Sequence, residues 1–150
     1  MTNEPYDLEI NWTFPQAAAE VFTAWISADQ LAEWWSFPGY SIPPDRVTVE
    51  PRIGGIWSVT AVSDDDGSEI PFTGTITEIE SGRRLVIALG EPKSDGHRSE
   101  MVVETRDTAD GSSMEFHHHA LGDKEEADEL RGGYEGFFFP SLTAYLAPEQ

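Results

Sequence analysis

The sequence predicts an α+β domain in which a curved antiparallel sheet of about seven strands wraps around a long C-terminal helix, with two short helices after the first strand. Three observations predict this fold: a leading segment of alternating apolar residues, six short β-rich runs separated by turn residues, and a closing helical stripe. The chain has 150 residues, of which 39% are hydrophobic, and this is enough for one core. We therefore expect residues 1–150 to form a single domain.

The N-terminal segment has the clearest strand pattern. Apolar and polar residues alternate over Tyr6–Phe14, which predicts a strand with one buried face. Pro15 suits the start of a helix, and apolar residues then recur every three or four positions as far as Ser27, so a first helix is expected. Asp29 is placed to cap a second short helix, which should end before Pro38 and an irregular loop.

The middle of the chain alternates β-rich runs with turn residues. Glycine, aspartate and serine mark the turns, for example at 54–55, 64–67 and 94–96. The runs between such turns predict six strands that follow one another as an antiparallel meander. These strands are expected over residues 46–50, 56–62, 70–79, 84–89, 99–106 and 113–120.

The segment 124–146 predicts the closing helix. Pro140 interrupts it, and because proline removes a backbone hydrogen bond and clashes with the preceding turn, we expect a kink or a helix restart near Phe139. One stripe of this helix should face the sheet, formed by Leu130, Tyr134, Phe137, Phe138, Leu142 and Tyr145.

Composition excludes several classes of function. The formal charge is −19, from 28 acidic and 9 basic residues, and this charge repels nucleic acids and anionic membrane surfaces. The absence of cysteine excludes disulfides, thiolate nucleophiles and cysteine-ligated zinc. The sequence shows neither an apolar run of membrane-spanning length nor a signal-peptide pattern, so we expect a soluble, cytoplasmic protein.

Tryptophans beside tight turns indicate where a ligand could bind. Trp34 and Trp35 end the second predicted helix, and Trp57 follows the glycine pair Gly54–Gly55. Such indoles line a pocket as readily as they fill a core, and both interpretations stay open. The candidate ligand-binding residues are Trp35, Trp57, Phe72, Ile76, Ile87, Met101, Phe116, His118, Phe137 and Phe138.

Three consecutive histidines lie on the last predicted strand. Because neighbouring side chains of a strand point to opposite faces, His118 should point inward with Phe116, and His117 and His119 outward. His118 is the candidate catalytic residue, able to hydrogen-bond or protonate a ligand carbonyl or phenol. The alternative is a structural histidine satisfied by a neighbouring side chain. His117 and His119 supply two metal ligands where zinc takes three or four, so we predict a solvated surface, no metal and no cofactor.

Five motifs follow one another along the chain: Pro15 with Val21–Trp25, Trp34–Trp35, Arg52–Trp57, the strand Gly74–Ile79 and the histidines His117–His119. This combination resembles the START-like, helix-grip superfamily, and within it the group named after the activator of the heat-shock-protein-90 ATPase. The resemblance covers about residues 8–146 and implies a helix-grip fold with an elongated apolar cavity between the sheet and the long helix. Relatives bind lipids, hormones or aromatic polyketides.

The leading functional hypothesis is a small-molecule-binding protein whose cavity takes an apolar, aromatic or polyketide- or lipid-like ligand, oriented by His118. One alternative is a cyclase- or hydrolase-like enzyme that uses His118 as acid or base. Chaperone activation and antibiotic self-resistance are further alternatives, which the resemblance implies. Phe137–Phe139 could face a pocket, the core or a homodimer interface, and periodicity leaves these three options open.

Overall fold

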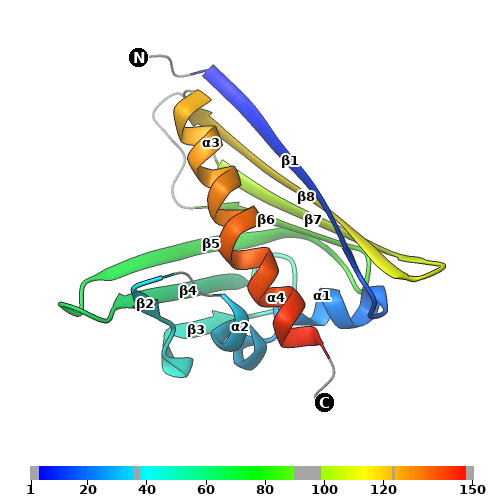
Figure 1. Ribbon diagram of the computed structural model, residues 1–150, viewed down its shortest axis with the longest axis horizontal. Coiled ribbons are helices and arrows are strands. Elements are labelled where there is room, and N and C mark those ends of the chain that lie inside the picture. The colour runs from blue at the N-terminus through cyan, green and yellow to red at the C-terminus, as the bar shows by residue number, and fades with distance from the viewer. Residues whose placement is uncertain (1–3, 36–37, 90–98, 123, 148–150) are drawn as a thin grey trace.

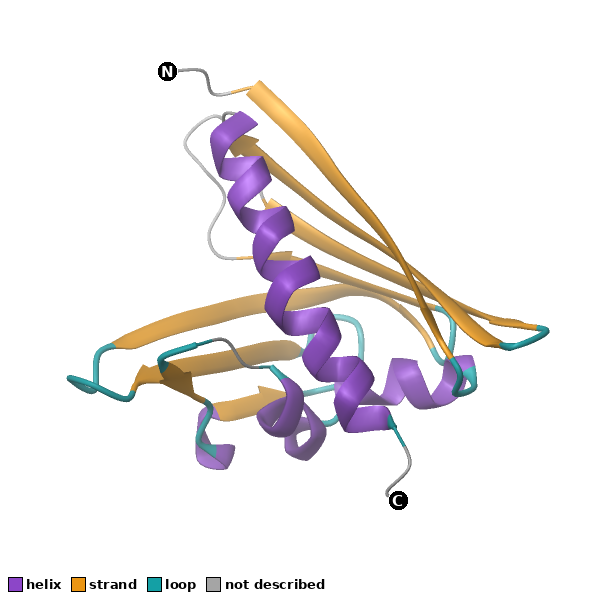
Figure 2. Ribbon diagram, in the orientation of Figure 1, coloured by secondary structure: helices purple, strands orange, loops and turns teal. Residues whose placement is uncertain are grey.

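The computed structural model describes residues 4–35, 38–89, 99–122 and 124–147. An antiparallel sheet curves around one long C-terminal helical segment (Figure 1). Two short helices lie beside the C-terminal end of that segment (Figure 2). This arrangement confirms the predicted α+β, helix-grip fold.

The sheet has eight strands in the order β1-β8-β7-β6-β5-β4-β2, and β3 pairs with β4. The first strand pairs with the last, so the two ends of the strand sequence meet inside one sheet. The strands are β1 Glu4–Phe14, β2 Tyr40–Ser41, β3 Val47–Val49, β4 Ile56–Ser63, β5 Glu69–Glu80, β6 Arg84–Leu89, β7 Ser99–Thr108 and β8 Gly111–Gly122.

The helical segments precede and follow the main run of strands. The α-helices are α1 Ala18–Ile26, α2 Ala28–Trp34, α3 Lys124–Gly133 and α4 Phe139–Leu146. A 3₁₀ turn, η1, covers Pro44–Arg46, and a π-helical turn, η2, covers Tyr134–Phe138. Together α3, η2 and α4 make the long segment that crosses the sheet in Figure 1.

The seven predicted strands are all present, and the eighth is new. It is β2, in the region predicted to be an irregular loop, where Tyr40 and Ser41 pair with Ser63 and Val62 of β4. Two residues are too few to show a period in the sequence, so only the partner strand reveals this one. The predicted turn at 94–96 and the side chains of Tyr6 and Ala120 lie outside the described part of the chain.

The starts of both short helices differ from the prediction. In α2 the capping residue is Ser27, whose hydroxyl accepts a hydrogen bond from the Gln30 N–H at 3.4 Å. Asp29 lies inside the first turn, where its negative charge interacts favourably with the positive end of the helix dipole. The α1 helix begins at Ala18, three residues after Pro15, the predicted start. It has no side-chain cap of its own, and a carboxylate oxygen of Asp107 from β7 accepts a hydrogen bond from the Ala18 N–H at 2.9 Å.

The π-helical turn accommodates Pro140. The Phe139 N–H donates to the Tyr134 carbonyl, five residues back, and α4 begins at Phe139, which confirms the predicted restart. Pro140 falls in the first turn of α4, where its missing N–H costs little. The wider turn also shifts the register of the buried stripe. The prediction was therefore wrong for Phe137 and Tyr145, which are 45% and 39% exposed, and Phe139 is buried instead.

Aromatic rings form the centre of the core. Trp25 is fully buried, and its ring contacts those of Trp34, Trp35 and Phe116 at centroid distances of 5.0, 5.9 and 5.8 Å. Trp57 joins the cluster by donating its indole N–H to the Trp25 carbonyl at 2.9 Å. Trp34, Trp35 and Trp57 therefore belong to one packed aromatic cluster.

The strands β5 and β6 lie very close together at Gly74, and a substitution there tests this contact. A Cβ atom on Gly74 would lie 2.5 Å from the carbonyl oxygen of Ala88. We expect Gly74→Ala to lower the free energy of unfolding by roughly 1–3 kcal/mol, because the backbone would have to move. Gly132→Ala in α3 is the matched control, since its Cβ meets nothing within 4 Å, and it should stabilise the helix by about 1 kcal/mol. Urea unfolding measures both, and equal effects would contradict the prediction.

Candidate functional site: a buried polar pair in an aromatic wall

The three histidines of β8 divide between the two faces of the sheet as predicted. Phe116 and His118 are buried, with exposed fractions of 0% and 7%, whereas His117 and His119 are partly exposed. The pairing of β8 with β1 on one side and β7 on the other holds this alternation in place. His118 therefore faces the interior of the domain.

His118 is part of a short polar chain between three elements. Its Nδ1 lies 2.8 Å from the hydroxyl of Tyr134 in the π-helical turn. That hydroxyl lies 3.7 Å from the sulfur of Met101, the residue directly opposite His118 on β7, and donates to it. The Tyr134 hydroxyl therefore links the ring of His118 to the sulfur of Met101, and the tautomer of the ring decides which of Nδ1 and the hydroxyl donates.

The electrostatic surroundings keep His118 neutral. Burial, together with the neighbouring His119, lowers the pKa of His118 from 6.5 to about 4. At neutral pH the ring can donate or accept a hydrogen bond, but it does not hold an imidazolium proton to transfer. At neutral pH the low pKa therefore leaves His118 as a hydrogen-bonding group and not as a general acid.

Aromatic side chains pack against the Tyr134 side of this polar pair. Phe138 lies 4.5 Å from Trp35 and 5.7 Å from Tyr134, measured between ring centroids. Phe72 of β5 completes the group at 5.5 Å from Trp35. Because Phe72 and Phe138 are only partly buried, this is where the aromatic interior reaches the surface.

Nine of the ten predicted ligand-binding residues lie in or against the core. The exception is Phe137, which the π-helical turn directs outward. Tyr134 was not among the predicted site residues, although its position on the predicted helical stripe indicated that it faces the sheet. The nine are Trp35, Trp57, Phe72, Ile76, Ile87, Met101, Phe116, His118 and Phe138.

Two indole N–H groups in the cluster are buried without a hydrogen-bond partner among the described residues. They belong to Trp25 and Trp35. In contrast, Trp34 donates to the Ala24 carbonyl at 2.8 Å and Trp12 to the Thr143 hydroxyl at 2.9 Å. A buried N–H without a partner is costly, so Trp25 and Trp35 offer donors that a ligand oxygen would satisfy.

Two hollows lined by described residues lie away from the aromatic cluster. One, of about 330 Å³, is polar and holds three of the chain's arginines, Arg83, Arg84 and Arg106. Arg84 is already paired with Glu78 and Glu104, at 2.7 and 2.8 Å. The other hollow, of about 530 Å³, lies between α1 and the end of α4 and includes Thr23 and Tyr145. Neither is the central apolar cavity that the resemblance implies.

Comparison with known proteins agrees with the overall fold. The family described as "Activator of Hsp90 ATPase homolog 1-like protein" matches residues 16–147. The chain belongs to this family. Among the described residues, no helix is both long enough and apolar enough to cross a membrane. A search of curated proteins gave no match.

Solved structures of family members and of uncharacterised proteins share the fold. The AHSA1 protein from Silicibacter pomeroyi is 22% identical, with 94% of this chain and 97% of that chain covered and a TM-score of 0.77. A protein from Chromobacterium violaceum is 15% identical, with 95% and 99% covered and a TM-score of 0.80. A protein of unknown function from Staphylococcus aureus is 19% identical, with 95% and 94% covered and a TM-score of 0.78. At these identities the likeness is one of fold.

The buried polar pair leads to a stability prediction. Tyr134→Phe removes the hydroxyl and leaves Nδ1 of His118 without that partner inside an apolar wall. We expect the free energy of unfolding to fall by roughly 1–3 kcal/mol, the cost of an unsatisfied buried polar atom. Tyr145→Phe makes the same chemical change at an exposed position and should have an effect within about 0.5 kcal/mol. Denaturant titration of both variants checks this, and a Tyr134→Phe effect as small as the control would refute it.

Proposed function

We propose that this protein binds an apolar, aromatic small molecule that carries one hydrogen-bonding oxygen. The observation that carries the proposal is the His118–Tyr134 pair, two polar side chains 2.8 Å apart in a wall of aromatic rings. Ligand sites of this type are mostly apolar, with few polar groups that fix the orientation of the ligand.

The π-helical turn supports this assignment. Such turns are rare and are frequent at functional sites, because the extra residue re-aims neighbouring side chains. Here the turn directs the Tyr134 hydroxyl to His118 and places the half-buried Phe138 against Trp35. Gly132 and Gly133 precede the turn and Gly136 lies within it, and glycine lowers the cost of local rearrangement there.

For a ligand to enter, the contact between Phe72 and Phe138 at the surface of the aromatic core would have to open. Phe72 and Phe138 contact each other edge-to-face at 6.5 Å, and both are half-buried. A ligand ring that replaced Phe138 on Trp35 would keep the aromatic contact and bring its oxygen toward the polar pair. The unpartnered Trp35 N–H would be a further donor for that oxygen.

Matched probes can separate the apolar part of this recognition from the polar part. 2-Naphthol and naphthalene differ by one hydroxyl, so a site anchored by His118 and Tyr134 should bind 2-naphthol roughly five- to tenfold more tightly. Tyr134→Phe should reduce that preference, and Tyr145→Phe should leave it unchanged. Equilibrium dialysis measures the affinities. Failure of both probes to bind would overturn the proposed function, and equal binding of the two would overturn the role of the polar pair.

A further inference from the structure

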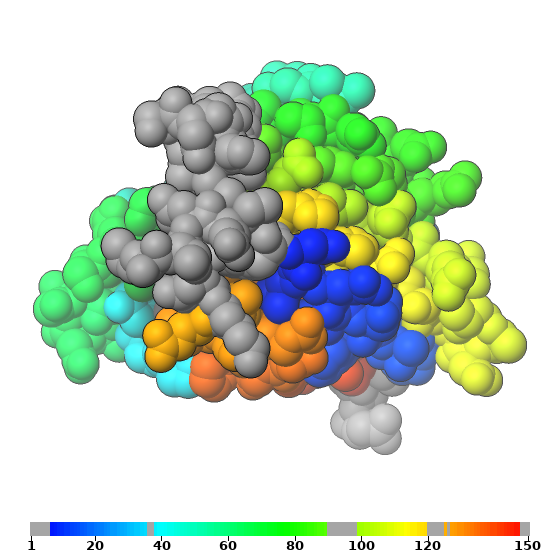
Figure 3. Space-filling model, turned by 90° about the horizontal axis from the view of Figure 1, so that it is seen from above, coloured from blue at the N-terminus to red at the C-terminus, as the bar shows by residue number. Residues whose placement is uncertain are grey.

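The outer face of the β1–β8 pair carries a cluster that the sequence period alone does not show. In the sheet register, Asp7 of β1 is directly opposite His119 of β8, and Glu9 is opposite His117. Directly opposite residues point to the same face, so the Asp7 carboxylate joins the two outward histidines. In Figure 3 the blue residues of β1 lie on the surface between the orange α3 and the yellow β8.

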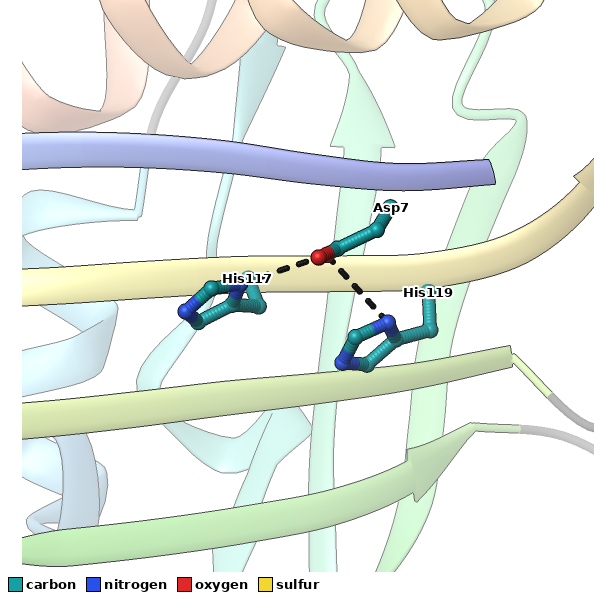
Figure 4. Close-up of side chains that lie close together, drawn as sticks. All are labelled: Asp7, His117 and His119. Atoms are coloured by element: carbon teal, nitrogen blue, oxygen red, sulfur yellow. Dashed lines mark hydrogen bonds and ion pairs between the residues drawn. The ribbon is translucent and has the colours of Figure 1, made fainter. Parts of the chain in front are cut away.

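The three side chains converge on one point. Oδ1 of Asp7 lies 3.2 Å from Nδ1 of His117 and 3.2 Å from Nδ1 of His119. Figure 4 shows the carboxylate oxygen between the two imidazole rings, which are nearly parallel, with an interplanar angle of 7°. The ligating atoms of the three residues all lie within 4.8 Å of one another.

We propose that Asp7, His117 and His119 form a binding site for a divalent transition metal, with Zn²⁺ as the ion. Tetrahedral zinc with ligand distances of about 2.0–2.1 Å places its ligand atoms about 3.3 Å apart, and two of the three separations here are already 3.2 Å. Three protein ligands leave the fourth position for water. Two imidazoles among three ligands favour zinc over Mg²⁺ and Ca²⁺, which prefer oxygen.

A second carboxylate supports the assignment. Oε1 of Glu115 lies 3.7 Å from Nε2 of His117, the nitrogen that does not face Asp7. Metal-bound histidines usually present their other N–H to a carboxylate or carbonyl, which orients the ring and increases its basicity. His117 therefore has one nitrogen for the metal and a carboxylate beside the other.

The local charge also favours a cation. Glu9 and Glu115 lie beside the cluster and form a further group of potential ligand atoms with His117. Glu100 of β7 is directly opposite His119 on its other side. In a chain of net charge −19 these carboxylates add an attractive potential to the directional contacts. The site lies outside the aromatic core, so a test of zinc binding does not depend on the proposed ligand function.

Calorimetric titration of the full chain with ZnCl₂ tests the site, using protein without a polyhistidine tag in about 0.15 M salt. We expect one zinc per chain, with no comparable binding of Mg²⁺ or Ca²⁺. Asp7→Asn and His119→Gln should each weaken zinc binding at least about tenfold. Asp29→Asn, which makes the same charge change at an exposed position of α2, is the matched control and should retain the affinity.

Three outcomes would overturn the proposal. The first is the absence of zinc binding by the unmodified chain. The second is an affinity that Asp7→Asn and Asp29→Asn reduce equally, which would indicate a general effect of charge. The third is binding lost in Glu115→Gln but retained in Asp7→Asn, which would place the ion at the neighbouring group of Glu9, Glu115 and His117.

Discussion

The antiparallel pairing of β1 with β8 is the constraint on which the rest of this structure depends. It joins residues 4–14 to residues 112–122, along the whole of β1. Because neighbouring side chains of a strand point to opposite faces, this pairing decides which face each histidine occupies. His118 is placed against the aromatic core, and His117 and His119 are placed beside Asp7 on the outside. A register shift of one residue would exchange the two faces and remove both arrangements.

The long helical segment adds the second constraint. After its π-helical turn a new α-helical stretch begins at Phe139, with Pro140 in the first turn, and the turn brings Tyr134 and Phe139 onto the buried side. The same turn supplies the hydroxyl that pairs with His118. Helix geometry and site chemistry are therefore linked at one place, because the widened turn directly before α4 also carries Tyr134.

The aromatic core is the part of the fold that holds the sheet and the helices together. Trp25 contacts both Trp35 and Phe116, and contacts between aromatic rings stabilise the folded state beyond the effect of burial alone. Two indole N–H groups in that core lack partners among the described residues, so part of the hydrogen-bonding capacity of the cluster is not used within the fold. Family members share this architecture, yet fold alone does not assign a ligand.

Seven of the eight strands, the inward face of β8 and the acidic character could be predicted from the sequence, because these depend on local period and composition. The helix restart near Pro140 could be predicted as well. The three-dimensional structure was needed to show that Ser27 rather than Asp29 caps α2, that Phe137 faces outward, that Tyr134 meets His118, and that Asp7 lies beside the outer histidines. Most of these depend on a turn geometry or on contacts between residues far apart in the chain, and such features have no signature in a sequence period.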